Sequence, residues 1–336
     1  MYPQSYVQES ISSNEPQSLQ TTRLAPSPTG ALHLGNAFSF LINWTIARKR
    51  NWRITLRIED LDTPRIKPGV IDQTIRTLEW IGLDWDSGPT MQAQNLDSYH
   101  HAMENLAQAG CVYPCELTRS QIERAASAPH GADTNPADPH QTHETRFDPQ
   151  LRPATIPSHF HGAQTNWRFL VHPGAIRFTD AHMGEQSFDI EQIMGDFVVW
   201  TKRSTPSYQL AVVVDDAASK ITQVVRGCDL LDSTCRQLML YRSLGIMNEP
   251  TYTHLPLIRG HDGRRLAKRH GDTRIDSYSQ AGTGQHRIIG LIAYWCKITQ
   301  ERSPMSIAEF QERFSLDTLP TDDIVFTQED DAWLRS

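Results

Sequence analysis

The order of structural signals in residues 21–62 most constrains the fold of this chain. A short apolar stretch ends at residues 26–30 (PSPTG), where proline and glycine end a strand and form turns. A helical pattern follows over residues 36–50, and residues 54–58 (ITLRI) have the composition of a buried strand. Acidic residues 59–62 (EDLD) follow directly. Strand, loop, helix, loop and strand in this order are typical of the start of a parallel, doubly wound α/β sheet.

The chain continues to alternate between helix and strand signals. Residues 70–82 and 96–110 are amphipathic and each segment ends in a glycine, which predicts two helices. Residues 210–214 (LAVVV) and 221–225 (ITQVV) are rich in β-branched side chains, which predicts two buried strands. We expect a further helix over residues 234–244. These elements together predict the α/β fold class.

Changes in composition predict the domain organisation. Residues 127–164 contain six prolines and five histidines with little apolar periodicity, which predicts a poorly ordered loop. We expect a disordered leader (1–20), the first half of an α/β domain (21–110), an inserted subdomain (111–195), the second half of the α/β domain (196–275) and a helical C-terminal part (276–336).

Composition also restricts the compartment and the partners. The leader has neither the basic and apolar regions of a secretory signal nor the arginines of a transit peptide. The apolar runs are much shorter than the ~20 residues of a membrane helix, and five cysteines form no disulfide framework. We therefore expect a cytoplasmic protein without a membrane partner. The net charge of −7 argues against general nucleic-acid binding but permits a local basic face.

Residues 27–36 (SPTGALHLGN) are the first candidate site. A nucleotide triphosphate binds where backbone N–H groups and a helix N-terminus face its phosphates. Gly30 and Gly35 permit close backbone approach, and His33 can donate a hydrogen bond to a phosphate oxygen. Taken alone, the same segment is also compatible with a surface turn.

Residues 264–271 (RRLAKRHG) are the second candidate site. Attack on an α-phosphate concentrates negative charge on the phosphorus, and a mobile cationic loop can neutralise that charge. Taken alone, this loop is also compatible with an ordinary solvated surface.

Five segments in this order together resemble the glutamyl branch of class I aminoacyl-tRNA synthetases. They are TRLAPSPTGALHLG, RIEDLD, YQLAVVVDDA, VVRGCDLLDST and RLAKRHG. The resemblance covers the chain from about Arg23 to Gly271, apart from the insertion. It implies a class I, Rossmann-like parallel sheet with an inserted acceptor-end-like subdomain and a short helical C-terminal part. It also implies the use of ATP and Mg²⁺.

The resemblance assigns the nucleotide site to two signatures. His33 to Asn36 match the family's HIGH signature, and Arg265 to Arg269 match its KMSKS signature. Lys268 would be the mobile-loop lysine that contacts ATP, and Ala267 stands where the family usually has serine. The implied catalytic residues are His33, Asn36 and Lys268, and the implied ATP-binding residues are His33, Gly35, Asn36, Arg265, Lys268 and Arg269.

The amino acid implied by the resemblance is glutamate, which carries two carboxylates and one ammonium. The planar fork of arginine suits a carboxylate, and the family pattern gives this role to Arg23 and Arg226. Glu59 would face the ammonium, while Ala25, Ser27 and Tyr208 would complete the pocket. The alternatives are surface ion pairs for the two arginines and a cap at a sheet end for Glu59.

Three features resemble the glutamyl-Q branch of the family, whose members attach glutamate to queuosine, the wobble base of tRNA(Asp). Residues 224–237 (VVRGCDLLDSTCRQ) are similar to that branch, and residues 37–40 (AFSF) lack the arginine that ordinary glutamyl enzymes usually have there. After Gly271 only 65 residues remain (336 − 271), too few for an anticodon-binding domain. The implied partners are L-glutamate and the queuosine-bearing anticodon arm of tRNA(Asp), with the chain acting as a monomer.

The sequence departs from the family at its structural zinc site. Cys115 matches the first cysteine of a Cys-x-Cys pair, but Leu117 stands at the second position, and the next cysteine is Cys228. Zinc requires four ligands, and the histidines of the insertion match no zinc spacing. We expect no bound zinc, with Cys111 and Cys115 as packed thiols.

Two other functions remain open from the sequence. One is a conventional glutamyl-tRNA synthetase that charges a tRNA 3′ end. The other is a non-catalytic paralogue that binds tRNA or adenylate. Ala267 and the lost zinc ligands favour it, whereas four intact residues disfavour it: His33, Glu59, Arg226 and Lys268.

Overall fold

The computed structural model describes residues 19–62, 65–126, 146–162, 164–264, 266 and 272–336. Of the implied site residues, Arg265, Lys268 and Arg269 lie outside this part of the chain, as does the leader apart from its last two residues.

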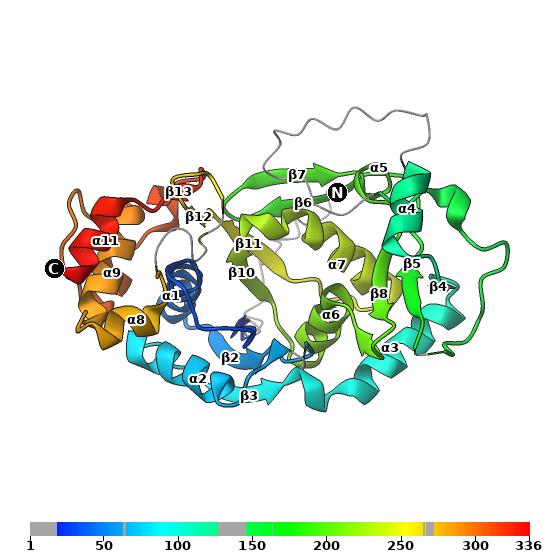
Figure 1. The fold of residues 1–336 in the computed structure, drawn as a ribbon, viewed down its shortest axis with the longest axis horizontal. Helices are drawn as coiled ribbons and strands as arrows, with labels where there is room; N and C mark the ends of the chain where they lie inside the picture. Colours follow the sequence, from blue (N-terminus) through cyan, green and yellow to red (C-terminus); the bar gives the residue numbers. More distant parts are fainter. Residues whose placement is uncertain (1–18, 63–64, 127–145, 163, 265, 267–271) are drawn as a thin grey trace, which may run out of the picture.

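Parallel strands form the centre of the fold (Figure 1). Strand β1 (Thr21–Leu24) pairs with β2 (Arg53–Ile58), and β2 pairs with β3 (Ser87–Met91). A second sheet begins with the parallel pair β10 (Gln223–Gly227) and β11 (Thr251–Leu255). The two sheets meet where the amide of residue 222, just before β10, donates to the carbonyl of residue 21 in β1 at 2.9 Å. The strand order therefore reverses between β1 and β10, and the carboxyl ends at such a switch point commonly bind ligands.

Helices connect the strands of the first half as the sequence predicts. Helix α1 (Leu34–Lys49) lies between β1 and β2, and α2 (Val70–Ile81) lies between β2 and β3. Helix α2 ends at Gly82, whose φ of 97° is the left-handed conformation that favours glycine. Helix α3 (Leu96–Gln108) follows β3 through η2 (Gln92–Gln94). The helices predicted over 36–50, 70–82 and 96–110 and the strand over 54–58 are confirmed.

The strand predicted over residues 210–214 is wrong. These residues lie in helix α6 (Tyr208–Ala218), which packs against α3, α7 (Leu231–Ser243) and β8 (Phe197–Thr201). A helix surrounded by protein is apolar on all sides, so five apolar residues in a row do not distinguish it from a buried strand. The strand predicted over 221–225 and the helix predicted over 234–244 are confirmed as β10 and α7.

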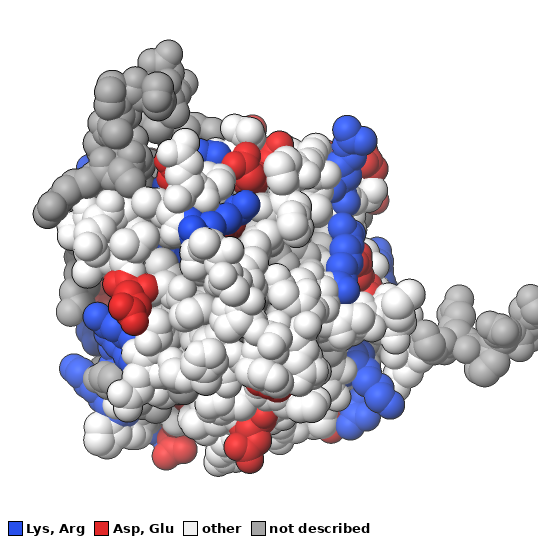
Figure 2. Space-filling view, turned by 90° about the vertical axis from the view of Figure 1, so that its right-hand side faces the viewer, with Lys and Arg blue, Asp and Glu red and all other residues white. Residues whose placement is uncertain are grey.

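The inserted subdomain is built on an antiparallel sheet in the order β4 (Val112–Cys115), β5 (Asn166–Phe169), β8 and β9 (Thr205–Pro206). Its sheet continues past the expected boundary at residue 195, since β8 and β9 come after that residue. The face at this end of the molecule carries mainly uncharged side chains, with Lys and Arg largely toward its edges (Figure 2). The elements of this region are β4 (Val112–Cys115), α4 (Arg119–Ala126), η3 (Pro149–Leu151), β5 (Asn166–Phe169), β6 (Ile176–Asp180), β7 (Gly184–Phe188), α5 (Ile190–Ile193), β8 and β9 (Thr205–Pro206).

The β6–β7 hairpin belongs to the second parallel sheet. Asp180, the last residue of β6, is the β-sheet partner of Tyr252 in β11. The strand order of this sheet is therefore β10-β11-β6-β7. This pairing places Asp180 of the insertion next to β11, the neighbour of β10 at the switch point.

The segment expected to be poorly ordered is packed where the structure describes it. Residues 127–145 lie outside the described part, but Phe147 is buried beside Tyr113 and Cys115. Arg152 forms two hydrogen bonds of 2.7 Å with the buried carboxylate of Asp196, which also accepts the Tyr113 hydroxyl. A buried carboxylate thus attaches this segment to β4, although proline-rich composition predicts weak packing.

The C-terminal part is mainly helical and shares a core with the first half of the α/β domain. The Phe38 ring of α1 packs edge-to-face on Trp295, with centroids 6.4 Å apart. Strand β13 pairs in parallel with β12. The elements after β10 are η4 (Cys228–Leu230), α7, β11, β12 (Ile258–Arg259), α8 (Ile275–Gln280), α9 (Gln285–Trp295), α10 (Ile307–Arg313), η6 (Leu316–Thr318), β13 (Ile324–Val325) and α11 (Gln328–Arg335).

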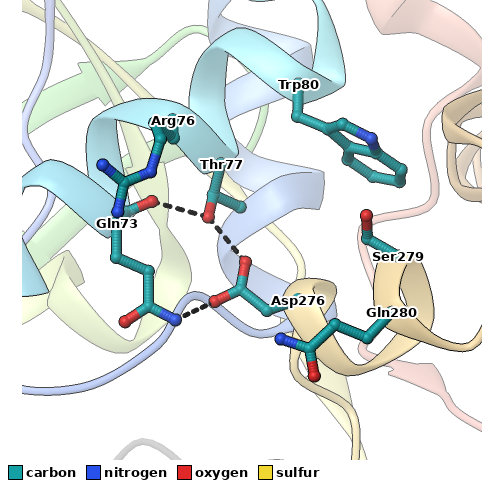
Figure 3. Close-up of a pocket in the computed structure, with 7 residues that line it drawn as sticks. All are labelled: Gln73, Arg76, Thr77, Trp80, Asp276, Ser279 and Gln280. Atoms are coloured by element: carbon teal, nitrogen blue, oxygen red, sulfur yellow. Dashed lines mark hydrogen bonds between the residues drawn. The ribbon is translucent and has the colours of Figure 1, made fainter.

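A hollow of about 320 Å³ separates α2 from α8 (Figure 3). Both carboxylate oxygens of Asp276 are occupied there, one by the Thr77 hydroxyl at 2.8 Å and the other by the Gln73 amide. These bonds attach α8, which follows the basic loop, to α2. None of the helices in the described part of the chain is long and apolar enough to cross a membrane.

Candidate active site

A cleft of about 690 Å³ opens at the switch point between β1 and β10. It brings together all the implied site residues that the structure describes, although they come from four separate segments of the chain. These residues are Arg23, Ala25, Ser27, His33, Gly35, Asn36, Glu59, Tyr208 and Arg226. Leu266, within the basic loop, also lines the cleft.

The first signature is locked to the segment that follows the basic loop. The His33 ring nitrogen Nδ1 lies 3.0 Å from the Thr273 hydroxyl, and the Leu34 amide donates to the Thr273 carbonyl at 3.0 Å. The Ile275 amide donates to the carbonyl of Leu32 at 2.9 Å. The first candidate site is therefore held by Thr273 and Ile275, which follow the second candidate site in the chain and lie about 240 residues from His33.

Helix α1 begins at this signature. The Asn36 side-chain oxygen accepts the His33 amide at 3.0 Å, so Asn36 caps the helix start as well as lining the cleft. Gly35 has no positive φ, and a Cβ there would lie 3.9 Å from Ile258, an ordinary contact. Its backbone conformation therefore does not require glycine. Its missing side chain leaves open space at the N-terminus of α1, where an anion is stabilised by free N–H groups and the helix dipole.

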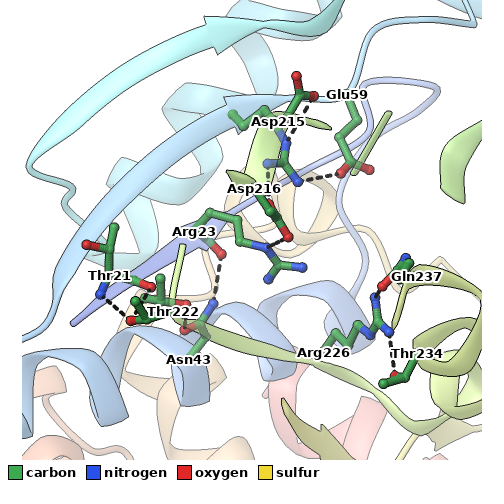
Figure 4. Close-up of polar contacts among 12 residues, drawn as sticks. Thr21, Arg23, Asn43, Glu59, Asp215, Asp216, Thr222, Arg226, Thr234 and Gln237 are labelled. Atoms are coloured by element: carbon green, nitrogen blue, oxygen red, sulfur yellow. Dashed lines mark hydrogen bonds and ion pairs between the residues drawn. The ribbon is translucent and has the colours of Figure 1, made fainter. Parts of the chain in front are cut away.

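Buried charges of both signs lie next to Arg23 and Glu59, two side chains that line the cleft (Figure 4). Arg57 donates to Asp216 at 2.5 Å and to Glu59 at 3.3 Å. The Arg23 Nε lies 3.4 Å from the other Asp216 oxygen. The side chains of Arg23, Arg57 and Asp216 are each at most 5% exposed, which excludes the surface ion pairs considered above for Arg23.

These charges shift one another's pKa values. Burial raises the pKa of Glu59, and Arg57 and Arg23 oppose that shift only in part. Burial also acts to raise the pKa of Asp216, but Arg57 and Arg23 overcome it and the pKa is lowered. Asp216 therefore stays ionised as the partner of the arginines. Glu59 lines the cleft, and the two arginines compensate the cost of burying its negative charge only in part.

The two arginines expected to bind carboxylates differ in how many guanidinium N–H groups are free of protein partners. The terminal nitrogens of Arg23 form no hydrogen bond with any residue that the structure describes, so this fork is open. The Arg226 guanidinium is buried and bonds Gln237 at 2.8 Å and Thr234 at 2.7 Å (Figure 4). Its Nε donates to His254 at 3.1 Å. Protein hydrogen bonds therefore fix the Arg226 guanidinium and use part of its donors, whereas both terminal nitrogens of Arg23 remain available to a ligand.

Sequence reasoning missed the residues that hold these arginines. Arg57 and Asp216 stand in the quoted segments RIEDLD and YQLAVVVDDA, but they received no role. Their signal was a charge inside an apolar run, since a buried charge requires a partner. Asp180 and His254 carried no comparable signal, because neither belongs to one of the five segments.

The expected zinc remnant lies away from the cleft. Cys115 is buried in β4, and Leu117 packs beside it in the same apolar cluster. In the described residues, no group of three or more histidine, cysteine or acidic side chains is arranged to hold a metal ion.

Comparisons with known proteins agree with this geometry. Residues 20–330 match the family described as "tRNA synthetases class I (E and Q), catalytic domain". The chain is 43% identical to a protein named glutamyl-Q tRNA(Asp) synthetase from Rhodopirellula baltica, over 87% of this chain and 88% of that protein. It is 41% identical to one of the same name from Symbiobacterium thermophilum, over 90% and 94%.

A solved structure supports the fold alone. The crystal structure of glutamate-tRNA synthetase from Elizabethkingia anophelis superposes with a TM-score of 0.74 at 24% identity, covering 94% of this chain and 70% of that one. The predicted class I architecture is thereby confirmed, and the cleft lies at the switch point of the parallel strands.

The chain belongs to the class I tRNA synthetases of the E and Q group and, within them, to the glutamyl-Q tRNA(Asp) synthetases.

Proposed function

We propose that the chain activates L-glutamate with ATP to glutamyl-adenylate and transfers the glutamyl group to queuosine at the wobble position of tRNA(Asp). The open guanidinium of Arg23, in the same cleft as the incompletely compensated carboxylate of Glu59, carries this proposal. A ligand that satisfies both has a carboxylate and an ammonium, as an amino acid does. The names of the two relatives support queuosine as the acceptor.

The glutamate subsite is formed by Arg23, Glu59, Tyr208 and Arg226 in this proposal. Arg23 and Arg226 bind the two carboxylates, and Glu59 binds the ammonium. Ala25 and Ser27 complete the wall, where the Ser27 hydroxyl donates to the Glu59 carbonyl at 3.3 Å. Holding three charged groups of glutamate at once orients its α-carboxylate toward the nucleotide.

The nucleotide subsite is formed by His33, Gly35 and Asn36, together with Arg265, Lys268 and Arg269 of the basic loop. The α-carboxylate of glutamate attacks the α-phosphorus of ATP, and pyrophosphate leaves. Mg²⁺, when present with ATP, would supply further neutralisation of the phosphate charge. His33 and Lys268 stabilise the negative charge that develops on the phosphate oxygens.

The second step transfers the glutamyl group. A hydroxyl of the queuosine ring attacks the carbonyl carbon of the mixed anhydride, and AMP leaves. We further propose that one chain acts as a monomer in the cytoplasm, where tRNA is available, and without a structural zinc.

The test is transfer of radiolabelled glutamate, with ATP, to tRNA(Asp) that carries queuosine. Queuosine-free tRNA(Asp) and tRNA(Glu) serve as controls. Label on the queuosine-bearing tRNA alone supports the proposal. Label on tRNA(Glu) favours a conventional synthetase, and absence of glutamate-dependent ATP–pyrophosphate exchange favours a non-catalytic paralogue. The Lys268→Ala variant is expected to lower the rate of exchange more than it raises the KM for glutamate.

A further inference from the structure

A line of buried hydrogen bonds leads from the insertion to the cleft. The Asp180 carboxylate, in β6, accepts Nδ1 of His254 at 2.7 Å. His254, in β11, faces Arg226 on the neighbouring strand β10, and the Arg226 Nε donates to the His254 Nε2 at 3.1 Å. Asp180 and His254 have fully buried side chains, and Arg226 lines the cleft.

The geometry determines which nitrogen of His254 carries the proton. The Arg226 Nε can only donate, so the His254 Nε2 must accept and is unprotonated. The ring proton then lies on Nδ1, where it is donated to the Asp180 carboxylate. By accepting the Nδ1–H hydrogen bond on the other side of the ring, the carboxylate favours the tautomer in which Nε2 is an acceptor.

The rest of the Arg226 environment does not replace this acceptor. Gln237 and Thr234 accept from the terminal nitrogens, and the Leu230 carbonyl lies 3.3 Å from one of them. The Nε is therefore served by His254 alone among the described residues. This bond fixes the direction of the Nε–H group and thereby the orientation of the guanidinium plane.

We propose that Asp180 and His254 are positioning residues of the amino-acid site: by fixing the His254 tautomer, Asp180 makes Nε2 the acceptor that orients the Arg226 guanidinium toward the bound amino acid. This inference rests on the proposed role of Arg226 in binding glutamate. It adds a contribution of the inserted subdomain to amino-acid affinity, because Asp180 ends the first strand of the β6–β7 hairpin.

Asp180 also has a structural role that the test must separate. Its Oδ1 accepts the backbone amides of His182 and Met183 at 3.0 and 2.8 Å, which closes the hairpin turn. The Asp180→Asn variant keeps an oxygen for these amides. Its amide nitrogen, however, donates to the His254 Nδ1, so the ring proton moves to Nε2 and faces the Arg226 donor.

Four variants separate positioning from turn formation: Asp180→Asn, His254→Leu, His254→Gln and the double variant Asp180→Asn/His254→Gln. Glutamine retains an acceptor oxygen for Arg226. Because it has no tautomers, its acceptor does not depend on Asp180. In ATP–pyrophosphate exchange we expect Asp180→Asn and His254→Leu to raise the KM for glutamate about ten- to a hundredfold, the effect of losing one hydrogen bond to a charged group. The KM for ATP should change less than about twofold.

Rescue is the decisive readout. His254→Gln should keep a glutamate KM near that of the wild type, and the double variant should match His254→Gln rather than Asp180→Asn. A double variant as impaired as Asp180→Asn would assign Asp180 to the turn alone and overturn the inference. An unchanged glutamate KM in both Asp180→Asn and His254→Leu would do the same.

A measurement without substrate keeps this inference distinct from the proposed function. The ¹⁵N shifts of the His254 ring should report a proton on Nδ1 in the wild type and on Nε2 in Asp180→Asn. The Arg226 Nε–H should exchange with solvent faster in that variant. If the wild type lacks glutamate-dependent exchange, the proposed function fails, whereas the same tautomer in both proteins overturns the inference whatever the substrate.

Discussion

The Arg57 guanidinium donates to the Asp216 carboxylate at 2.5 Å in the protein interior, and the two side chains are only 3% and 2% exposed. This pair joins β2, which ends at the cleft beside Glu59, to α6, which begins at Tyr208. Asp216 also compensates Arg23. Asp216 therefore faces both arginines, while Glu59 and Asp215 are further acidic neighbours of Arg57 at 3.3 and 3.9 Å.

Asp216→Asn is expected to destabilise the protein by about 3–5 kcal/mol, because it leaves Arg57 and Arg23 with one buried countercharge fewer. The measurement is urea unfolding at pH 7. The exposed pair Arg242–Glu249 provides the control, since Glu249→Gln removes the negative charge from a contact of 2.7 Å at the surface and should cost less than about 1 kcal/mol. Equal losses in the two variants would contradict the role of burial.

Glu59→Gln is expected to raise the KM for glutamate about ten- to a hundredfold in ATP–pyrophosphate exchange, because an amide attracts an ammonium far less than a carboxylate does. The KM for ATP should remain unchanged. Glu301→Gln, at an exposed position, controls for the general loss of one negative charge. A glutamate KM that does not respond to Glu59→Gln would remove Glu59 from the ammonium subsite and return it to the alternative of a structural cap.

The local parts of this site were predictable from the sequence. The turn at residues 26–30, the helix predicted from residue 36 and the strand before Glu59 depend on neighbours in the chain, and each left a pattern there. The helix begins two residues earlier than predicted, at Leu34. The resemblance added Arg226 and Tyr208, and both line the same cleft as His33.

The contacts that hold the site were not predictable in the same way. Arg57 and Asp216 are 159 residues apart, and Asp180 and His254 are 74 residues apart. Such pairs form only when strands and helices from distant segments are packed together. The error over residues 210–214 has the same origin, because only the tertiary packing of α6 distinguishes a buried helix from a buried strand there.

Gly290→Ala is expected to destabilise the protein by about 1–3 kcal/mol through overpacking. A Cβ at this position of α9 would lie 1.9 Å from the backbone carbonyl oxygen of Ser303, so one of the two segments has to move. Helix α9 supports α1 through the Trp295–Phe38 contact, which links the substitution to the nucleotide side of the cleft.

Gly284→Ala is the matched control for this change. Gly284, the N-cap of the same helix, has no positive φ and has no atom within 4 Å of an added Cβ. Alanine is a poorer N-cap than glycine but also lowers the conformational entropy of the unfolded chain, so the net cost should stay below about 1 kcal/mol. Urea unfolding of both variants gives the comparison. Similar stabilities would show that the Ser303 segment moves freely away from α9.

The pH dependence of stability should report the neutral state of His254. Burial lowers the pKa of His254 from 6.5 to about 4, with Arg226 acting in the same direction and Asp180 opposing them. The unfolded chain therefore binds this proton at a higher pH than the folded protein does. Stability is complete above pH 6.5 and is lost as the pH falls from 6.5 toward 4, by up to about 3 kcal/mol from this group.

The His254→Gln variant lacks this titration, so the difference between wild type and variant isolates it from other groups. The pKa of Asp180 is itself lowered below 3.8, which keeps its titration under this window. Urea unfolding at several pH values between 4.5 and 7 should show the wild type losing stability more steeply than His254→Gln toward low pH. Parallel curves would mean that His254 takes up its proton equally in both states, which is incompatible with its acceptor role toward Arg226.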